Sequence, residues 1–204
     1  MQPFRTLTAL AAPLDRANVD TDQIIPKQFL KRIERTGYGD FLFFDWRRTA
    51  AGDPDPAFVL NDPRYRDAQI LIAGKNFACG SSREHAAWAL SDFGFRAVIA
   101  PTFADIFFSN AGKNGIVLAR LTEEQVAELL QNAKTIPGYK LTVSLEDQTV
   151  TDSQGFKATF DVDPFRKFCL IEGLDDIGLT LRHAAELDAF EARHDQDGWL
   201  KAKA

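Results

Sequence analysis

The feature that most constrains the fold is an alternation of short apolar runs and amphipathic segments in the middle third of the chain. They follow one another along residues 68–73, 83–93, 96–100, 102–111 and 115–119. The first, third and fifth have the length and apolar composition of buried strands. The second carries apolar residues at helical spacing and ends before Gly94, and the fourth predicts another short helix. Strand, helix, strand, helix, strand with short connections predicts a parallel α/β layer.

The part of the chain that follows predicts a small second β layer. Residues 141–145 and 158–162 alternate apolar and polar positions, as the strands of a hairpin or meander do. Thr122 opens a capping box, and Asp163 caps one more helix. A peripheral C-terminal helix is expected within residues 179–204. The whole chain of 204 residues is long enough for one domain, so residues 1–204 are expected to form a single three-layer or sandwich-like α/β fold.

The first third of the chain lacks this regularity. Residues 18–26 predict a short strand that leads into a polar turn and ends at Pro26. Residues 31–56 place charges, glycines and prolines around an aromatic cluster, which predicts a long loop. Because loops of that length are uncommon in compact domains, we expect residues 31–56 to serve function or to be held by a partner.

Composition argues against several classes of function. The net charge of −5 and the lack of a basic stripe argue against nucleic-acid binding. No apolar run approaches the roughly 20 residues of a membrane helix. Residues 7–14 are a poor secretory signal because they are few and include Pro13. Cys79 and Cys169 belong to no C-x-x-C pair, so a reduced cytoplasmic setting is expected. The three histidines have no zinc-ligand spacing, and no metal is expected on this chain.

The segment from Asn76 to Ala86 is the strongest candidate for chemistry. It lies between a predicted strand and a predicted helix N-terminus, where ligands collect in open α/β sheets. Helix N–H groups favour an anion there, and Gly80 allows close approach of the backbone to a ligand. Arg83 adds a planar cation suited to a carboxylate.

From spacing alone, two other interpretations of this segment stay open. Ser81 and Glu84 fit the S-x-x-E capping box, so Ser81 could simply close the helix end. Alternatively, Cys79 could be a nucleophile activated by the helix end and His85, which would make the chain a stand-alone hydrolase.

Several motifs together resemble a known family. Gly80-Ser-Ser-Arg-Glu-His-Ala86 resembles the G-S-S-R-E-H-A signature of the swivelling β/β/α domain of the aconitase superfamily. Asp20-Thr-Asp-Gln-Ile-Ile-Pro26 is similar to a D-T-D-x-I-I-P element of its small-subunit members. Residues 37–47 and 173–180 are similar to segments of bacterial 3-isopropylmalate dehydratase small subunits.

This resemblance implies a hydro-lyase of leucine biosynthesis that converts 2-isopropylmalate into 3-isopropylmalate through isopropylmaleate. In that family the 4Fe–4S cluster belongs to a separate large subunit, so the resemblance implies a heteromeric enzyme. A related homoaconitase or methylmalate-type dehydratase is the alternative within the same superfamily. A subunit that only binds or assembles, without catalytic residues, is another.

The resemblance also implies residue roles. Ser81 corresponds to the serine whose alkoxide takes the proton from carbon, Arg83 to the arginine that holds a substrate carboxylate, and Ser82 to a neighbouring hydrogen-bond donor. A pocket that favours the charged form of a hydroxyl is needed for such a base.

Further residues are implied to bind the substrate. Thr21 and Asp22 match a threonine and an aspartate near the site, although an Asx-type turn also explains them. Phe29, Leu30 and Lys31 correspond to a loop that selects the substrate side chain, where Phe29, Leu30 or Ile33 could supply an apolar wall.

Overall fold

The structure, a computed structural model, describes residues 1–196 and is built on one seven-stranded sheet. The strand order is β4-β3-β2-β1-β5-β6-β7. Strands β1 to β4 pair in parallel, and β1, β5, β6 and β7 pair antiparallel. The strands are β1 (Thr6–Leu14), β2 (Ile70–Ala73), β3 (Ala97–Ala100), β4 (Val117–Arg120), β5 (Lys140–Ser144), β6 (Thr149–Thr151) and β7 (Lys157–Thr159).

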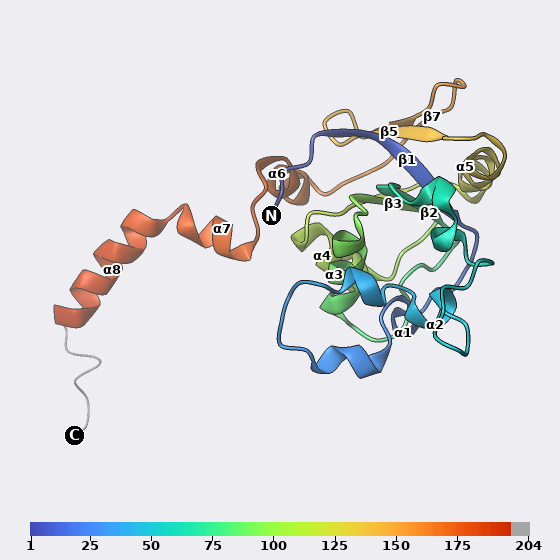
Figure 1. Cartoon of the computed structure of the whole chain (residues 1–204). Helices are drawn as coiled ribbons and strands as arrows, with labels where there is room; N and C mark the ends of the chain where they lie inside the picture. The colour runs from blue at the N-terminus through green and yellow to red at the C-terminus, as the bar shows by residue number, and fades with distance from the viewer. Residues whose placement is uncertain (197–204) are drawn as a thin grey trace.

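Strand β1 joins the two halves of the sheet. Its first half, residues 6–10, pairs with β5, and its second half, residues 11–14, pairs with β2. The sheet therefore curls, and the antiparallel half lies above the parallel half (Figure 1). This central strand was not predicted from the sequence, where residues 7–14 were considered only as a secretory signal. Pro13 would in any case disfavour a strand in the middle of a sheet. Pro13 is tolerated because it lies beyond Leu10, the last residue that pairs with β5, so β2 is its one neighbouring strand.

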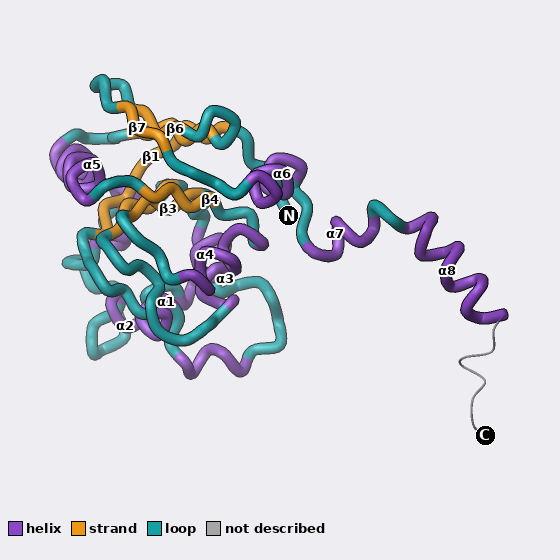
Figure 2. The backbone as a smooth tube through the Cα atoms, turned by 180° about the vertical axis from the view of Figure 1, so that it is seen from behind, coloured by secondary structure: helices purple, strands orange, loops and turns teal. Residues whose placement is uncertain are grey.

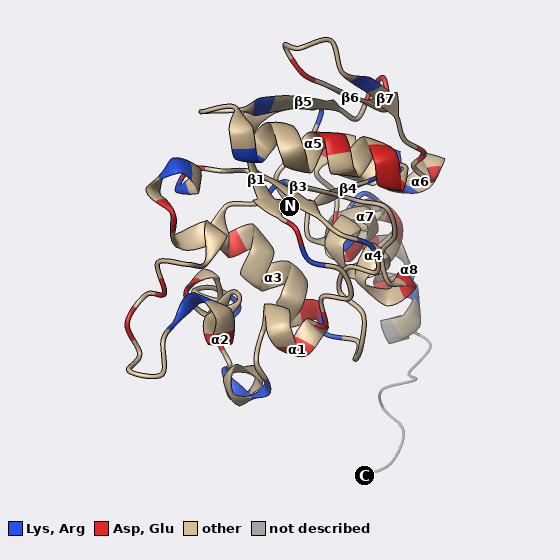
Figure 3. Cartoon of the chain, turned by 90° about the vertical axis from the view of Figure 1, so that its right-hand side faces the viewer, with Lys and Arg blue, Asp and Glu red and all other residues tan. Residues whose placement is uncertain are grey.

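Alternation along the parallel strands divides the interior into two cores. Ile70 and Ile72 belong to the core beneath the antiparallel strands, and Leu71 and Ala73 belong to the core beneath the helices. Helices α3 and α4 cover the outer face of the parallel strands, whereas α5 lies between the two halves of the sheet (Figures 2 and 3). The expected three-layer α/β arrangement, with a parallel layer and a small meander, is confirmed.

The helices begin and end close to the predicted positions in the regular part of the chain. They are α1 (Thr21–Ile24), α2 (Phe44–Arg47), α3 (Glu84–Phe93), α4 (Asp105–Lys113), α5 (Glu123–Thr135), α6 (Pro164–Glu172), α7 (Asp176–Leu181) and α8 (Ala184–Gln196). Short 3-10 turns cover Lys27–Lys31, Gly39–Phe41, Val59–Asn61 and Pro63–Tyr65. Thr122 caps α5 in a capping box, and Asp163 caps α6.

The prediction of a strand within residues 18–26 was wrong. Residues 21–24 form one helical turn, α1, because Asp20 accepts a hydrogen bond from the backbone of Asp22 and Gln23 closes a capping box. Within residues 31–56, Tyr38, Leu42 and Phe43 are fully buried, so this long connection packs against the helical layer.

The C-terminal segment leaves the body of the molecule. Two helices, α7 and α8, replace the single helix expected there, since the backbone tightens to three-residue hydrogen bonds at Arg182 and His183. Both helices project away from the sheet in Figures 1 and 2. The last residues of the expected helix, 197–204, lie outside the described part of the chain. No helix in the described residues combines the length and apolarity needed to cross a membrane.

Candidate active site

The loop between β2 and α3 is held between two other segments of the chain. On one side, the N–H of Cys79 donates to the carbonyl of Val19 (3.0 Å), and the N–H of Thr21 donates to the carbonyl of Cys79 (2.8 Å). On the other side, the N–H of Phe77 donates to the carbonyl of Thr102 (3.0 Å). All three segments follow or approach the carboxyl ends of parallel strands, so the fold itself brings them together.

Three alternate residues of this loop have left-handed backbones. The φ angles are +58° at Asn76, +60° at Ala78 and +92° at Gly80. A Cβ atom at Gly80 would lie 2.2 Å from the Oδ2 atom of Asp20, so no larger residue fits without displacing that carboxylate. Positive φ angles at the non-glycine residues Asn76 and Ala78 cost free energy, which makes this loop a candidate functional element.

A cavity of about 220 Å³ opens at the end of this loop. It is lined by Thr21, Ala78, Gly80, Ser81, Ser82, Arg83, Ala104, Asp105, Ile106 and Phe107. The structure thus gathers five of the residues singled out from the sequence: Thr21, Gly80, Ser81, Ser82 and Arg83. Larger cavities lie beside β1 and residues 56–65, at the N-terminal segment, and between Gly39 and Asp92, and none of them includes these residues.

Arg83 is fixed at the start of α3. Its side chain is 14% exposed, forms an ion pair with the carboxylate of Asp22 and donates to the carbonyl of Ile25 (3.3 Å). Both interactions use Nη1, so among residues 1–196 the Nε and Nη2 donors remain for a ligand. Asp22 therefore orients the guanidinium without occupying the whole fork.

The main chain of Ser81 is anchored while its hydroxyl stays open. The buried Thr21 hydroxyl, on a residue that is 2% exposed, donates to the carbonyl of Ser81 (2.9 Å). Ser81 and Ser82 are both exposed. Within residues 1–196, the Ser81 hydroxyl has no hydrogen-bond partner, and the N–H groups of Ser82, Arg83 and Glu84 have no acceptor.

The capping-box interpretation of Ser81 was wrong. Helix α3 begins at Glu84, its N-cap is Arg83, and no side chain caps it. Glu84 is thus the first helical residue, whereas a capping box needs it at the third position. Ser81, Ser82 and Arg83 line the cavity, and the N–H groups at this end of α3 have no acceptor within residues 1–196, so this end of the helix can bind an anion.

The predicted side-chain-selecting residues lie apart from this cavity. Phe29, Leu30 and Lys31 occupy the 3-10 turn Lys27–Lys31. Phe29 stacks on Phe41 with ring centroids 4.1 Å apart, and Leu30 packs against the helical-layer core. Lys31 is exposed. None of the three lines the cavity.

Cys79 lacks the environment of a nucleophile. Burial raises the pKa of its thiol, and the neighbouring Asp20 carboxylate raises that pKa further. The thiolate is the reactive form, so both effects oppose the hydrolase interpretation. His85 contacts the rings of Tyr38 (5.4 Å) and Trp88 (4.6 Å), and burial lowers its pKa.

The described residues do not fit an iron–sulfur cluster. Within residues 1–196, no group of three or more His, Cys, Asp or Glu side chains could hold a metal ion. Cys79 lies in the cavity loop, and Cys169 is buried in α6. A 4Fe–4S cluster needs several thiolates, so this chain does not supply its ligands.

The contribution of the start of α4 to the cavity was not predicted from the sequence. Ala104, Asp105, Ile106 and Phe107 form the other wall of the cavity. The order of strands and helices along the chain could have indicated it, because α4 follows β3, the strand beside β2. Loops that follow neighbouring parallel strands meet at one edge of the sheet, so the start of α4 belongs beside the loop after β2.

Comparison with protein families defines the class of this chain. A family model described as the aconitase C-terminal domain matches residues 1–124. A LeuD_N model matches residues 127–164, and a model of the C-terminal domain of the 3-isopropylmalate dehydratase small subunit matches residues 176–202. The fold and these matches define an aconitase-type domain.

Individual relatives narrow the class. A 3-isopropylmalate dehydratase small subunit of Acidobacterium capsulatum is 68% identical over 200 residues, which cover 98% of this chain and 94% of that protein. The Brevibacillus brevis protein of the same name is 56% identical, and the match covers 95% of this chain and 100% of that protein. The chain belongs to the family of 3-isopropylmalate dehydratase small subunits, which makes it a subunit of a hydro-lyase.

A solved structure has the same fold. The Methanocaldococcus jannaschii 3-isopropylmalate dehydratase (leuD) chain superposes with a TM-score of 0.66 at 23% identity. The match covers 90% of this chain and 99% of that one.

Proposed function

We propose that this chain supplies the base and the carboxylate anchor of an isopropylmalate-isomerising dehydratase. The reaction interconverts 2-isopropylmalate and 3-isopropylmalate through isopropylmaleate. A separate large subunit, which carries the 4Fe–4S cluster, completes the site, and the complex works in the cytoplasm. The observation that supports this proposal most directly is the gathering of Ser81, Ser82 and Arg83 around one cavity in a member of this family.

Ser81 is the proton acceptor in this proposal. A serine hydroxyl is a weak base in water, so its alkoxide needs positive potential and hydrogen-bond donors. Arg83 and the free N–H groups at the start of α3 supply both. As the proton leaves one carbon, hydroxide departs from the neighbouring carbon and the double bond of isopropylmaleate forms; the metal of the large subunit would accept that hydroxide as a Lewis acid. The protonated Ser81 then returns its proton to the carbon that lost the hydroxide, while water adds to the other carbon.

Arg83 holds a carboxylate of the substrate, and Ser82 donates a hydrogen bond beside it. Asp22 keeps the guanidinium in place through Nη1, so the free edge can bind a carboxylate with two parallel hydrogen bonds. A lysine at this position would retain the charge but lose the planar fork.

The test is reconstitution of the chain with a cluster-loaded large subunit under anaerobic conditions, with isopropylmaleate followed by ultraviolet absorbance. Ser81→Ala should reduce kcat by a factor of about 10² to 10⁴, because the proton transfer loses its acceptor. Ser153→Ala, in the exposed turn between β6 and β7, is the matched control and should keep full turnover.

Two outcomes would contradict the proposal. Full turnover by the Ser81→Ala complex would remove Ser81 from the base role. Weaker association of Ser81→Ala and Arg83→Lys with the large subunit, at unchanged turnover per complex, would indicate a subunit that only assembles.

A further inference from the structure

We propose that the first turn of α4 selects the substrate's side chain, with Ile106 as the apolar wall and Asp105 as the group that rejects a further carboxylate. This inference rests on the proposed function, because it concerns the part of the same cavity that faces the substrate's substituent.

Ile106 is an apolar side chain left open at the candidate site. It is 54% exposed, yet it lines the cavity together with Ser81 and Arg83. The buried Phe107 and the half-buried Ala104 continue the apolar surface next to it. A branched hydrocarbon substituent would gain contact area there when the site closes.

The apolar residues that follow α1 do not line the cavity. Ile33 is 96% exposed and Leu30 packs on the core, and neither lines the cavity. Phe29 is held against Phe41 and Phe44, with ring centroids 4.1 Å and 4.9 Å away. The apolar part of the cavity wall therefore comes mainly from α4.

Asp105 is the one carboxylate among the residues that line the cavity. Asp105 is exposed, and its side chain forms no ion pair or hydrogen bond within residues 1–196. Arg83, which also lines the cavity, attracts a carboxylate, whereas Asp105 repels one placed beside Ile106. A 2-substituted malate with a hydrocarbon substituent avoids this repulsion, and one with a carboxymethyl substituent does not. Specificity of this kind uses a repulsive group as well as an attractive one.

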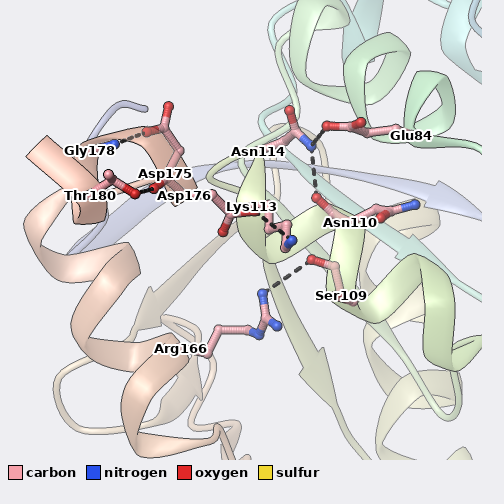
Figure 4. Close-up of polar contacts among 10 residues, drawn as sticks. All are labelled: Glu84, Ser109, Asn110, Lys113, Asn114, Arg166, Asp175, Asp176, Gly178 and Thr180. Carbon is pink, nitrogen blue, oxygen red and sulfur yellow. Dashed lines mark hydrogen bonds and ion pairs between the residues drawn. The ribbon is translucent and has the colours of Figure 1, made fainter. Parts of the chain in front are cut away.

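Helix α4 is anchored well enough to act as a fixed wall. The side chain of Arg166 donates to the carbonyl of Ser109 (3.1 Å), and Lys113 pairs with Asp176 (2.7 Å), as Figure 4 shows. At its C-terminal end, Asn114 donates to the carbonyl of Asn110 (2.8 Å). These contacts lie beyond the first turn along the helix, so they hold α4 while leaving Asp105 and Ile106 open to a ligand.

The experiment measures kcat/KM of the reconstituted complex on malates whose 2-substituent is isopropyl, methyl or carboxymethyl. Ile106→Ala should lower the isopropyl-to-methyl ratio by about tenfold or more, the range expected for lost packing against a methyl or methylene group. Asp105→Asn, which keeps the shape and removes the charge, should raise the carboxymethyl-to-isopropyl ratio by about tenfold. Ile177→Ala, on exposed α7, is the control and should leave both ratios unchanged.

The outcomes separate this inference from the proposed function. If Leu30→Ala shifts the isopropyl-to-methyl ratio and Ile106→Ala does not, selection belongs to the Lys27–Lys31 turn and the inference is overturned. If Asp105→Asn leaves the carboxymethyl ratio unchanged, its role in rejection is overturned. If the unmodified complex fails to turn over the isopropyl compound at all, the proposed function fails first.

Discussion

The cavity loop and the C-terminal arm, residues 176–196, are held to the molecule in opposite ways. The loop before α3 forms backbone hydrogen bonds to flanking segments on both sides, and three of its residues have positive φ angles. The arm is joined to the body at its base, and its large apolar side chains Ile177, Leu181, Leu187 and Phe190 are exposed. The contrast shows that the chain's own contacts orient Ser81 and Arg83 before any ligand binds, whereas they leave the arm largely uncovered.

The largest effect is expected from Gly80→Ala, which tests whether the loop geometry is as closely determined as this contrast implies. The new Cβ would meet the carboxylate of Asp20, and the left-handed backbone would be strained as well. Strain alone costs about 1–3 kcal/mol, and the displaced loop should lose at least ~100-fold in kcat. Urea unfolding and turnover of the reconstituted complex measure the two effects.

Gly155→Ala separates strain from collision. Gly155 also has a positive φ, +100°, but no atom outside its immediate neighbours lies within 4 Å of the position that a Cβ would take there. Gly155→Ala should therefore lower the free energy of unfolding through backbone strain, with no loss of turnover. Equal effects of the two substitutions on stability and activity would mean that the loop can shift away from Asp20 without consequence.

A smaller effect is expected from Thr21→Val, which removes one contact of the loop and keeps the shape of the side chain. The carbonyl of Ser81 would lose its buried hydrogen-bond donor, which should lower the free energy of unfolding by about 1–3 kcal/mol. We expect kcat to fall by about tenfold while KM changes less, because Thr21 positions Ser81 rather than holding the substrate.

Thr21→Ser keeps the hydroxyl and should restore most of kcat. A rise in KM with unchanged kcat would instead assign Thr21 to substrate binding, which is the role that the sequence resemblance implied. No rescue by serine would point to the methyl group and to packing.

The same contrast explains which parts of the molecule could be predicted from the sequence. The regular part of the chain was predictable because its strands and helices have strong local periodicity. In addition, α5 and α6 begin at clear caps, Thr122 and Asp163. Strand β1 was not predictable, because it belongs to two half-sheets through long-range pairing. The same pairing leaves Pro13 with β2 as its one neighbouring strand, so the proline is tolerated there.

For the site, the motif located Ser81 and Arg83, but geometry was needed to add α4. Local spacing also favoured a cap by Ser81, and only the start of α3 at Glu84 decided against it. The packing of Phe29 on Phe41 depends on tertiary contacts that no local pattern contains. The chemical character of the site could therefore be predicted from its residue types, whereas the shape of the cavity could not.

The smallest effect concerns the base of the arm and depends on pH. Asp175 caps α7 by accepting a hydrogen bond from the N–H of Gly178 (2.7 Å), and this bond lowers the pKa of the Asp175 carboxyl. The chain N-terminus, 3.7 Å away, lowers that pKa further. A pKa that is lower in the folded state stabilises the fold at neutral pH, and this contribution is lost as the pH falls through the depressed value.

Hydrogen exchange at the amide of Gly178 should therefore become faster on acidification than its intrinsic rate predicts. Asp175→Asn keeps a capping oxygen without the charge, so its exchange should follow the intrinsic rate across the same pH range. If both proteins respond alike, the cap does not depend on ionisation of Asp175, and the base of the arm is held by the pair between Lys113 and Asp176 instead. Turnover should change little in this test, because the cavity loop has its own contacts and shares none of them with Asp175.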